Sequence, residues 1–473
     1  MTEVNSQMSI SRIASNTITA ATAKWRGSRM LRATAWSTST LFVGQALRVL
    51  ANLVVSRLLA PDVFGLMAIV LIIQSLIYML CDVGLVQLVM RSKRDNDAKF
   101  LNTIWTVQIG RGFLIWGLGL FIALLMLIAG RNGLLPFGSA WNAPELPALI
   151  AVTMFGTVIS GCQSARVLLA YRDMHVKQLA LIELAAQITG IIVMISLAIF
   201  VKSAWVFVLS GLVSSMLTTV LGYWILPGPR ERLAWDKATL AEIYGAGGWI
   251  ILGSLSYVAS ANADRLLLAG WVSPTELGLY SVPVSLIALI EMVGTRVVGT
   301  ILQPALNETA RTNPTALRAQ LHRLRLTLDA SYLLVAGTLF AIAQPLISLI
   351  YDPRYAAAGH VLQILSFTLL FSRYQHIVGS VYFAMGHPQL MAGIAIIRLV
   401  AILIMLPIGF HFGGFEGALI AIVLHQVPGV LTIFCINHRH NLNDFWLELR
   451  VLPAWFAGAF AGFSSLAIMA LLH

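Results

Sequence analysis

Charged residues are scarce in this chain. Only 11% of its 473 residues are Asp, Glu, Lys or Arg, against about 25% in an average soluble domain. Hydrophobic residues make up 58% of the sequence, and the mean hydropathy is +0.83, which together exclude an ordinary soluble protein. The chain holds many apolar runs of about 18 residues or more, each long enough to cross a hydrocarbon core of about 30 Å. The fold class we predict is all-α, a polytopic membrane helical bundle.

Several chemical signatures are also absent. The three cysteines, Cys81, Cys162 and Cys435, lie in apolar segments without paired spacing, which favours small core residues over disulfides or metal ligands. No G-x-x-x-x-G-K-[ST] motif supplies an ATP site, and no extramembrane segment is large enough for a catalytic domain. We therefore predict neither enzyme activity nor a metal or cofactor, and expect a proton or sodium gradient or the membrane potential as the energy source. Residues 1–35 lack an apolar h-region and favour a cytoplasmic tail, although an organellar transit peptide would share their composition.

A repeat organises the rest of the chain. Residues 51–66 read ANLVVSRLLAPDVFGL, and the stretch from residue 261 reads ANADRLLLAGWVSPTELGLY. Both copies contain Ala-Asn, then Arg-Leu-Leu, then a proline and a Gly-Leu pair. A second echo of nearly the same offset relates residues 168–183 to 382–398. Two echoes in one register predict a duplicated bundle.

Thirteen membrane spans are predicted, twelve of them in the duplicated set. Their approximate bounds are 36–59, 63–83, 104–129, 147–170, 177–200, 204–226, 245–271, 277–303, 328–351, 360–384, 389–411, 414–435 and 450–472. This pattern predicts five regions. They are a tail (1–35), an N-lobe of six spans (36–226), a linker (227–244), a C-lobe of six spans (245–436), and a C-terminal loop with an extra helix (437–473).

The basic residues predict the orientation. With a cytoplasmic N-terminus, twenty Lys and Arg fall in the tail and inner loops and three in the outer loops, namely Arg131, Lys202 and Arg354. The positive-inside rule therefore places the N-terminus inside. Because the net charge of +11 comes mostly from short loops, it does not predict nucleic-acid binding.

The remaining eight basic residues lie within predicted spans. A charge at bilayer depth costs several kcal/mol unless it faces water, a partner or the protein interior, so each is a functional candidate. Five of them lie deeper in the membrane, and each is about equally expected to line a polar cavity or to have a structural role. They are Arg48, Arg111, Arg296, Arg373 and Arg398. Guanidinium groups at such depth suit a ligand with its own negative charge, such as a phosphate or pyrophosphate.

The other intramembrane charges have structural alternatives. Snorkelling or helix pairing explains the repeat-related Arg57 and Arg265 as well as substrate contact does, and Asp264 beside Arg265 could form a structural pair. Glu183 aligns roughly with Arg398 in the second echo, which suggests a gating or structural pair. The acids Asp82 and Glu291 are the candidates for ion coupling.

Two motifs carry a family resemblance. RLLAPDVFGLM followed by CDVGLVQLVMR (81–91) resembles the polysaccharide-transporter family of the MOP superfamily, the O-antigen and exopolysaccharide flippases of bacterial envelopes. DRLLLAGWVSPTELGLYSVP (264–283) is similar to the matching seventh-helix pattern, and QPAL (303–306) fits the end of the eighth helix. The resemblance covers about residues 36–440.

The resemblance implies two pseudo-symmetric six-helix lobes, a central cationic cavity and alternating access in the inner (plasma) membrane. The implied substrate is an undecaprenyl-pyrophosphate-linked oligosaccharide, with membrane lipids, a polysaccharide polymerase and a chain-length regulator as the implied partners. Some members have fourteen helices, so twelve, thirteen or fourteen stay open here.

Three alternatives to this function stay open. A multidrug exporter of the same superfamily should carry an acid in an early helix, whereas the first predicted span has two arginines and none. A flippase for lipid-linked peptidoglycan precursors would share the cationic cavity. A membrane glycosyltransferase or polymerase belongs to a different class, and would usually have acidic motifs in substantial loops.

Overall fold

The computed structural model describes residue 36 and residues 39–82, 84–91, 97–173, 175–228, 231–237, 239–240, 242, 261–313, 316–443 and 445–472. The predicted tail, parts of the predicted linker and residues 245–260 of the seventh predicted span lie outside the described residues. Within the described part, every regular element is a helix.

The first half of the bundle consists of these helices: the first helix (Ser39–Leu58), α2 (Pro61–Leu80), α3 (Leu85–Arg91), α4 (Ala98–Arg131), α5 (Leu146–Gly161), α6 (Arg166–Arg172), α7 (Val176–Phe200) and α8 (Trp205–Ile225). A short 3₁₀ turn, η1 (Ala140–Asn142), precedes α5. These helices cover all six spans predicted for the N-lobe.

The second half begins with a helical stretch over residues 261–268. It continues with α10 (Pro274–Val297), the π-helix η2 (Val298–Leu302), α11 (Gln303–Thr312), α12 (Leu317–Ile350), η4 (Pro353–Tyr355), α13 (Ala357–Leu365), α14 (Thr368–Arg373), the π-helix η5 (Tyr374–Val378), α15 (Gly379–Ala384), α16 (Pro388–Leu424), α17 (Val427–Arg439) and α18 (Phe445–Leu472). Each span predicted after residue 261 therefore has a helical counterpart.

Local sequence explains where key helices begin. Pro61 and Pro274 occupy the first turns of α2 and α10, where the missing amide hydrogen of proline has no helical partner to lose. Ser273 forms a capping box with Glu276, whose backbone amide donates to the Ser273 hydroxyl at 3.2 Å. The two related helices thus begin at equivalent points of the repeat.

Some spans are broken rather than straight. Helices α5 and α6 meet at 69°, and the tenth predicted span is divided among α13, α14, η5 and α15. Within α16, Gly414 has φ 56°, where only glycine fits easily, and the chain reverses there. Gly409 and Gly417, which stand before and after the reversal, lie with their backbones in contact. The segment therefore holds two spans, as predicted.

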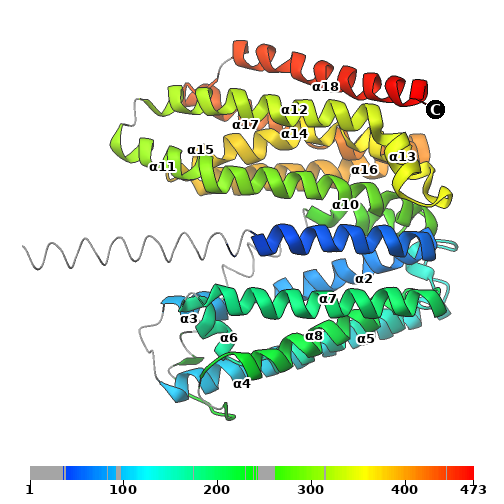
Figure 1. Cartoon of the computed structure of the whole chain (residues 1–473), viewed down its shortest axis with the longest axis vertical. Helices are drawn as coiled ribbons and strands as arrows, with labels where there is room; N and C mark the ends of the chain where they lie inside the picture. Colours follow the sequence, from blue (N-terminus) through cyan, green and yellow to red (C-terminus); the bar gives the residue numbers. More distant parts are fainter. Residues whose placement is uncertain are drawn as a thin grey trace, which may run out of the picture.

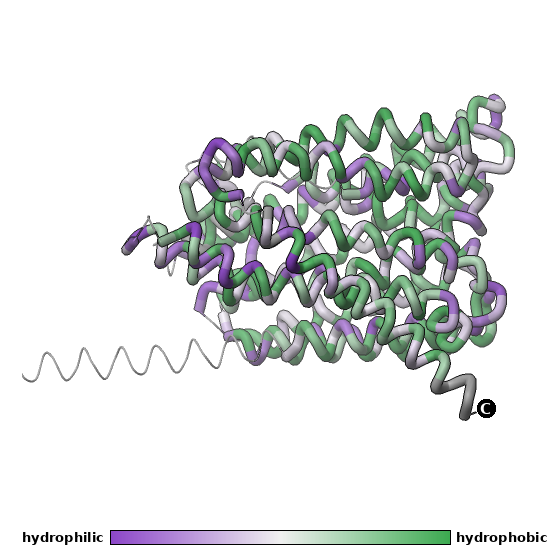
Figure 2. The backbone as a smooth tube through the Cα atoms, turned by 90° about the horizontal axis from the view of Figure 1, so that it is seen from above, coloured by the Kyte–Doolittle hydropathy of each residue, from purple (hydrophilic) through white to green (hydrophobic). Residues whose placement is uncertain are grey.

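Nine helices in the described residues are long and apolar enough to cross a membrane, and a tenth span counts the bent α5–α6 pair. Hydrophobic segments run along the helices, whereas hydrophilic ones gather at the two ends of the bundle (Figure 2). The predicted all-α, multi-pass membrane bundle is confirmed. The cysteine prediction is only partly right, since Cys81 is buried, Cys162 half-buried and Cys435 exposed.

The two halves form separate groups of helices that meet along α2 and α10 (Figure 1). We call the end of the bundle where the first helix ends and α2 begins the distal end. There, a methyl group on Gly65 would lie 2.0 Å from the Pro274 carbonyl oxygen, and one on Gly278 would lie 1.8 Å from that of Pro61. Residues without side chains are required on both helices for this approach.

Helix α18 lies on the outside of the second group, along α12 (Figure 1). Trp455 stacks on Phe367 with ring centroids 5.8 Å apart and also contacts Phe340. On the side away from these contacts, Phe456 and Phe460 are exposed, as expected for a helix that faces lipid. The extra C-terminal helix is thus packed on the C-lobe.

Candidate functional site

Three helices of the N-lobe carry polar residues spaced four or eight positions apart. On the first helix these are Thr40, Arg48 and Asn52; on α7, Glu183 and Gln187; on α8, Ser210, Ser214 and Thr218. A spacing of four places side chains on one face of a helix. All three polar faces point toward one another, so each helix contributes a polar stripe in an otherwise apolar segment.

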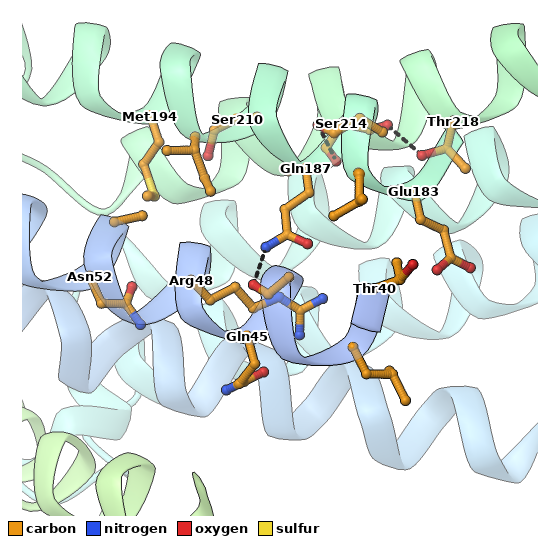
Figure 3. Close-up of a pocket in the computed structure, with 18 of the residues that line it drawn as sticks. Thr40, Gln45, Arg48, Asn52, Glu183, Gln187, Met194, Ser210, Ser214 and Thr218 are labelled. Carbon is orange, nitrogen blue, oxygen red and sulfur yellow. Dashed lines mark hydrogen bonds between the residues drawn. The ribbon is translucent and has the colours of Figure 1, made fainter. Parts of the chain in front are cut away.

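The stripes enclose a cavity of about 590 Å³. It is lined by the residues above together with Gln45 and small or apolar residues of the same helices, and Met292 of α10 also reaches it. Figure 3 shows Arg48 and Gln45 extending from the first helix and Glu183 and Gln187 from α7, opposite them. The volume lies within the range typical of small-molecule sites.

Hydrogen bonds join the three helices around this cavity. The Gln187 side-chain amide donates to the Gly44 carbonyl oxygen, which joins α7 to the first helix (Figure 3). Ser214 donates to the Ala186 carbonyl oxygen at 3.1 Å, which joins α8 to α7. These bonds satisfy polar groups that would otherwise be costly at bilayer depth.

The cavity lies midway along its helices. Arg48 is the tenth residue of a 20-residue helix, and at a rise of about 1.5 Å per residue it is roughly 15 Å from either end. Gln187 and Ser214 stand close to the centres of α7 and α8. Transporters built from repeats commonly bind their substrates at this depth.

The lining has a defined chemistry. Among its polar groups hydroxyls and amides predominate, with one guanidinium (Arg48) and one carboxylate (Glu183), and the rest of the lining is apolar or small. Hydroxyls and amides both donate and accept hydrogen bonds, so the polar stripes match a ligand that carries hydroxyl and amide groups. Arg48 adds a site for an anionic group.

Arg111 and Asp82, predicted for different roles, lie together. Arg111 Nη1 is 3.4 Å from Asp82 Oδ1, and its Nη2 donates to the Tyr78 hydroxyl at 2.9 Å. The guanidinium also lies 4.7 Å from the Tyr78 ring centroid. Tyr78 in turn lines a second N-lobe cavity of about 420 Å³, which shares Phe207 with the first.

Arg373 occupies a buried ion cluster that sequence reasoning did not anticipate. It is 3% exposed, and its Nη1 lies 3.2 Å from Asp329 and its Nη2 3.2 Å from Glu448. Arg325 contacts the same two acids at 2.9 and 2.6 Å, and the Tyr374 hydroxyl donates to Glu448 at 2.6 Å. Two arginines thus meet two carboxylates, and the cluster joins α12, α14, η5 and α18.

Arg296, Glu291 and Arg398 belong to the C-lobe. Arg296 is half-buried in the last turn of α10, and Glu291 stands one turn earlier on the same helix. Arg398 of α16 donates to the Gln375 side chain of η5. None of these three residues lines either N-lobe cavity described above.

The expected pair of Glu183 and Arg398 is not formed between the described side chains. Glu183 lies in the N-lobe and accepts a hydrogen bond from Tyr171 at 3.0 Å, whereas Arg398 contacts Gln375. Glu183 and Arg398 were paired because they hold roughly equivalent positions in the two copies of the second sequence echo. Equivalent places in a duplicated bundle need not be neighbours.

The remaining candidates lie near the distal end. Arg57 is exposed, and its carbonyl oxygen accepts a hydrogen bond from Arg354 at 3.2 Å. Asp264 accepts a hydrogen bond from the buried Tyr280 hydroxyl, next to the half-buried Arg265. The carboxylate of Asp264 is thus engaged by a tyrosine of α10.

The neutral polar side chains of the cavity were not among the predicted site residues, because the prediction rested on the cost of charges at bilayer depth. Thr40 and Asn52 stand eight positions before and four positions after Arg48 on the first helix, and Ser210, Ser214 and Thr218 stand four apart on α8. Polar residues that recur at multiples of four positions in an apolar segment are the sequence signal for both polar faces.

Comparisons with known proteins give the family. Residues 54–358 match the family described as "Polysaccharide biosynthesis protein". The lipopolysaccharide biosynthesis protein WzxC of Escherichia coli (strain K12) is 21% identical over 422 residues, which cover 89% of this chain and 83% of that protein. The chain therefore belongs to the polysaccharide biosynthesis protein family.

Solved structures identify the fold. A lipid II flippase MurJ, in an inward closed conformation, matches with a TM-score of 0.62 at 12% identity, covering 92% of this chain and 99% of that one. An inward-facing multidrug resistance MATE family transporter of the MOP superfamily matches with a TM-score of 0.57 at 16% identity, covering 87% and 95%. The predicted family and its two-lobe MOP fold are confirmed.

Proposed function

We propose that this protein is a flippase that moves an undecaprenyl-pyrophosphate-linked oligosaccharide across the bacterial inner membrane for surface polysaccharide or exopolysaccharide synthesis. The observation that carries the proposal is the hydroxyl- and amide-lined N-lobe cavity at mid-depth, with Arg48 in its wall. It is supported by family membership and by a relative named for lipopolysaccharide biosynthesis.

The chemistry of the cavity suits a glycan attached to an anionic group. Sugar rings present many hydroxyls, and often acetamido groups, that pair with Gln187, Asn52 and Ser214. A phosphate needs at least one strong cationic donor, and guanidinium groups bind it bidentately. Arg48 would contact the pyrophosphate, while the neutral stripes would bind the sugars.

Contacts between the lobes support alternating access with the distal end closed. Besides Gly65 and Gly278, the Trp141 indole donates to the Leu266 carbonyl oxygen at 3.3 Å, and the Tyr355 hydroxyl donates to that of Leu59 at 3.2 Å. With a cytoplasmic N-terminus, as the positive-inside rule favours, the distal end is periplasmic. The described conformation would then receive its substrate from the cytoplasmic side.

A multidrug exporter is a weaker candidate for this chain. The matched MATE transporter shares the fold, but no acid occurs in the described first helix, and Arg48 stands in the cavity wall. An arginine there opposes a cationic drug. A flippase for peptidoglycan precursors would need the same Arg48 contact, so only the sugars distinguish it.

A deletion strain tests the proposed function. We expect loss of surface polysaccharide and accumulation of lipid-linked repeat units on the inner leaflet, both restored by the wild-type gene. A gene carrying Arg48→Ala should not restore them, whereas Lys202→Ala, at an exposed residue between α7 and α8, should. Unchanged polysaccharide together with increased sensitivity to cationic drugs would establish the exporter instead.

A further inference from the structure

The second cavity of the N-lobe takes no part in the substrate contacts proposed above. Its described wall comes from α2, α5 and α8, and its volume of about 420 Å³ is within the range typical of small-molecule sites. The aromatic rings of Tyr78 and Phe207, one amide and several hydroxyls line it. A cavity of this size and polarity inside a membrane bundle calls for an occupant.

Helix α8 separates this cavity from the one that contains Arg48. Ser214 lines the first cavity (Figure 3), whereas Ser215 lines the second. Neighbouring positions differ by about 100° around a helix, so these two serines face different sides of α8. Phe207 and Gly211 line both cavities. The two cavities therefore adjoin along one edge of the helix.

Gly211 leaves the boundary between the cavities open. A methyl group added to Gly211 would meet no atom of the described residues within 4 Å, whereas one added to Gly156, in the wall of the second cavity, would lie 3.3 Å from Leu212. Since Gly211 faces both cavities, its missing side chain leaves room for one ligand to occupy the two together.

Three polar groups of the second cavity have no hydrogen-bond partner among the described residues. The hydroxyl oxygen of Thr153 is buried and unpaired, and neither the Gln74 amide nor the Ser215 hydroxyl bonds to another described residue. Buried polar groups are normally paired. Three such groups around one cavity indicate that a polar ligand completes their hydrogen bonding.

The other polar groups of the wall supply both acceptors and donors. Ser75 and Ser160 donate to carbonyl oxygens of their own helices, at 2.8 and 3.0 Å, which leaves their hydroxyl oxygens as acceptors. The Tyr78 hydroxyl accepts from Arg111 at 2.9 Å, which leaves its proton to donate. Ligand hydroxyls, which also donate and accept, match this combination.

The wall distinguishes a sugar ring from a phosphate and from a lipid chain. No charged side chain is among its described residues, and a buried charge without a partner is costly, so a phosphate is disfavoured. A lipid chain would leave the amide and the hydroxyls unpaired. A sugar ring satisfies them, and its apolar C–H faces pack on the faces of aromatic rings such as Tyr78 and Phe207.

We propose that the second cavity binds a sugar ring of the substrate, next to the part of the substrate that contacts Arg48. This assignment rests on the proposed function for the identity of the substrate. The two cavities together would bind a repeat unit of at least two sugars, and a single sugar would leave the second cavity without its ligand. Arg111, bound to the Tyr78 hydroxyl, is placed to receive an acidic group of that ring.

Thiol protection in the purified full chain tests the site without a lipid-linked substrate. In a background of Cys81→Ala, Cys162→Ala and Cys435→Ala, Ser215→Cys places a thiol in the second cavity, and Ser210→Cys places one in the first. The alkylation rate in lipid nanodiscs is measured with methyl glycosides of glucose, N-acetylglucosamine and glucuronic acid. At least one glycoside should slow alkylation of the Ser215→Cys thiol in a saturable manner.

Gln74→Leu removes the amide and nearly preserves the side-chain volume. It should raise the glycoside concentration needed for half protection about two- to tenfold, the effect of one lost hydrogen bond. Gln389→Leu, at an exposed residue of α16, is the matched control and should leave protection unchanged. Saturation-transfer difference nuclear magnetic resonance of the same glycosides, with the native chain and with Gln74→Leu, repeats the comparison without an introduced thiol.

A linked ligand is tested at the boundary. A methyl disaccharide should protect the Ser210→Cys and Ser215→Cys thiols alike, and Gly211→Leu should abolish this double protection, whereas Gly117→Leu, also in open space, should not.

Protection of the Ser210→Cys thiol alone, or protection unchanged by Gln74→Leu, would overturn the proposal. So would a Ser215→Cys thiol that reacts only after lipid is removed, since a lipid chain would then occupy the cavity. Absence of protection by every glycoside has the same meaning. Because these measurements use purified protein, their outcome is independent of whether the deletion strain loses its polysaccharide.

Discussion

Gly65 of α2 and Gly278 of α10 occupy equivalent positions in the two repeats, and each lies against the proline that begins the other helix. A methyl group on either glycine would come within about 2 Å of that proline's carbonyl oxygen, at 2.0 Å for Gly65 and 1.8 Å for Gly278. Such a reciprocal contact is typical of two elements related by a two-fold axis. The sequence repeat is therefore visible as pseudo-symmetry at the junction of the lobes.

Gly278→Ala should weaken the closed distal end. The new methyl group meets backbone atoms that cannot rotate away, and overpacking of this kind costs about 1–3 kcal/mol. Spin labels placed across the distal end should therefore report a larger population of widely separated lobes than in the wild type. Gly117→Ala, on α4 with nothing near its added methyl group, is the control, and an unchanged distance distribution in Gly278→Ala would contradict the closure described.

Glu448→Gln should destabilise the protein strongly. The change leaves Arg325 and Arg373 with Asp329 as the sole carboxylate of the cluster, and breaking a buried ion pair costs about 3–5 kcal/mol. Thermal unfolding in detergent should begin well below the wild-type temperature, and protease should release α18 early. Glu416→Gln, in an exposed pair, should unfold like the wild type.

The sequence was most informative about what the bilayer dictates. Apolar runs, loop charges and the repeat predicted the helices and their order because lipid leaves the backbone few alternatives. Side-chain partners were harder to predict, as Arg373 illustrates. Its acids, Asp329 and Glu448, are 44 and 75 positions away in the sequence, and only the packing of α12 and α18 brings them together. Nor does any periodic pattern in the sequence predict the two π-helices, η2 and η5.

Arg48→Ala should reduce transport while leaving the fold intact. Arg48 is exposed to the cavity, and a charge-assisted hydrogen bond is worth about 1.5–3 kcal/mol, so substrate affinity should fall about tenfold or more. Arg48→Lys should retain part of the activity, because the charge remains but the bidentate geometry is lost. Surface polysaccharide per cell, normalised to the amount of protein in the membrane, measures both. Equal activity of Arg48→Ala and the wild type would remove Arg48 from the site.

A double-mutant cycle distinguishes two roles of Arg111: a structural pair with Asp82, or a contact with the substrate. Arg111→Ala alone leaves Asp82 without the guanidinium 3.4 Å away, and Asp82→Asn alone leaves the Arg111 charge without its acid. If the two residues serve mainly each other, the double variant should recover thermal stability and transport relative to Arg111→Ala, with a coupling energy of about 0.5–3 kcal/mol. If Arg111 binds the anionic part of the substrate, the double variant should recover stability while transport stays lost. Because Tyr78 both receives a hydrogen bond from Arg111 and lines the second cavity, we expect the second result.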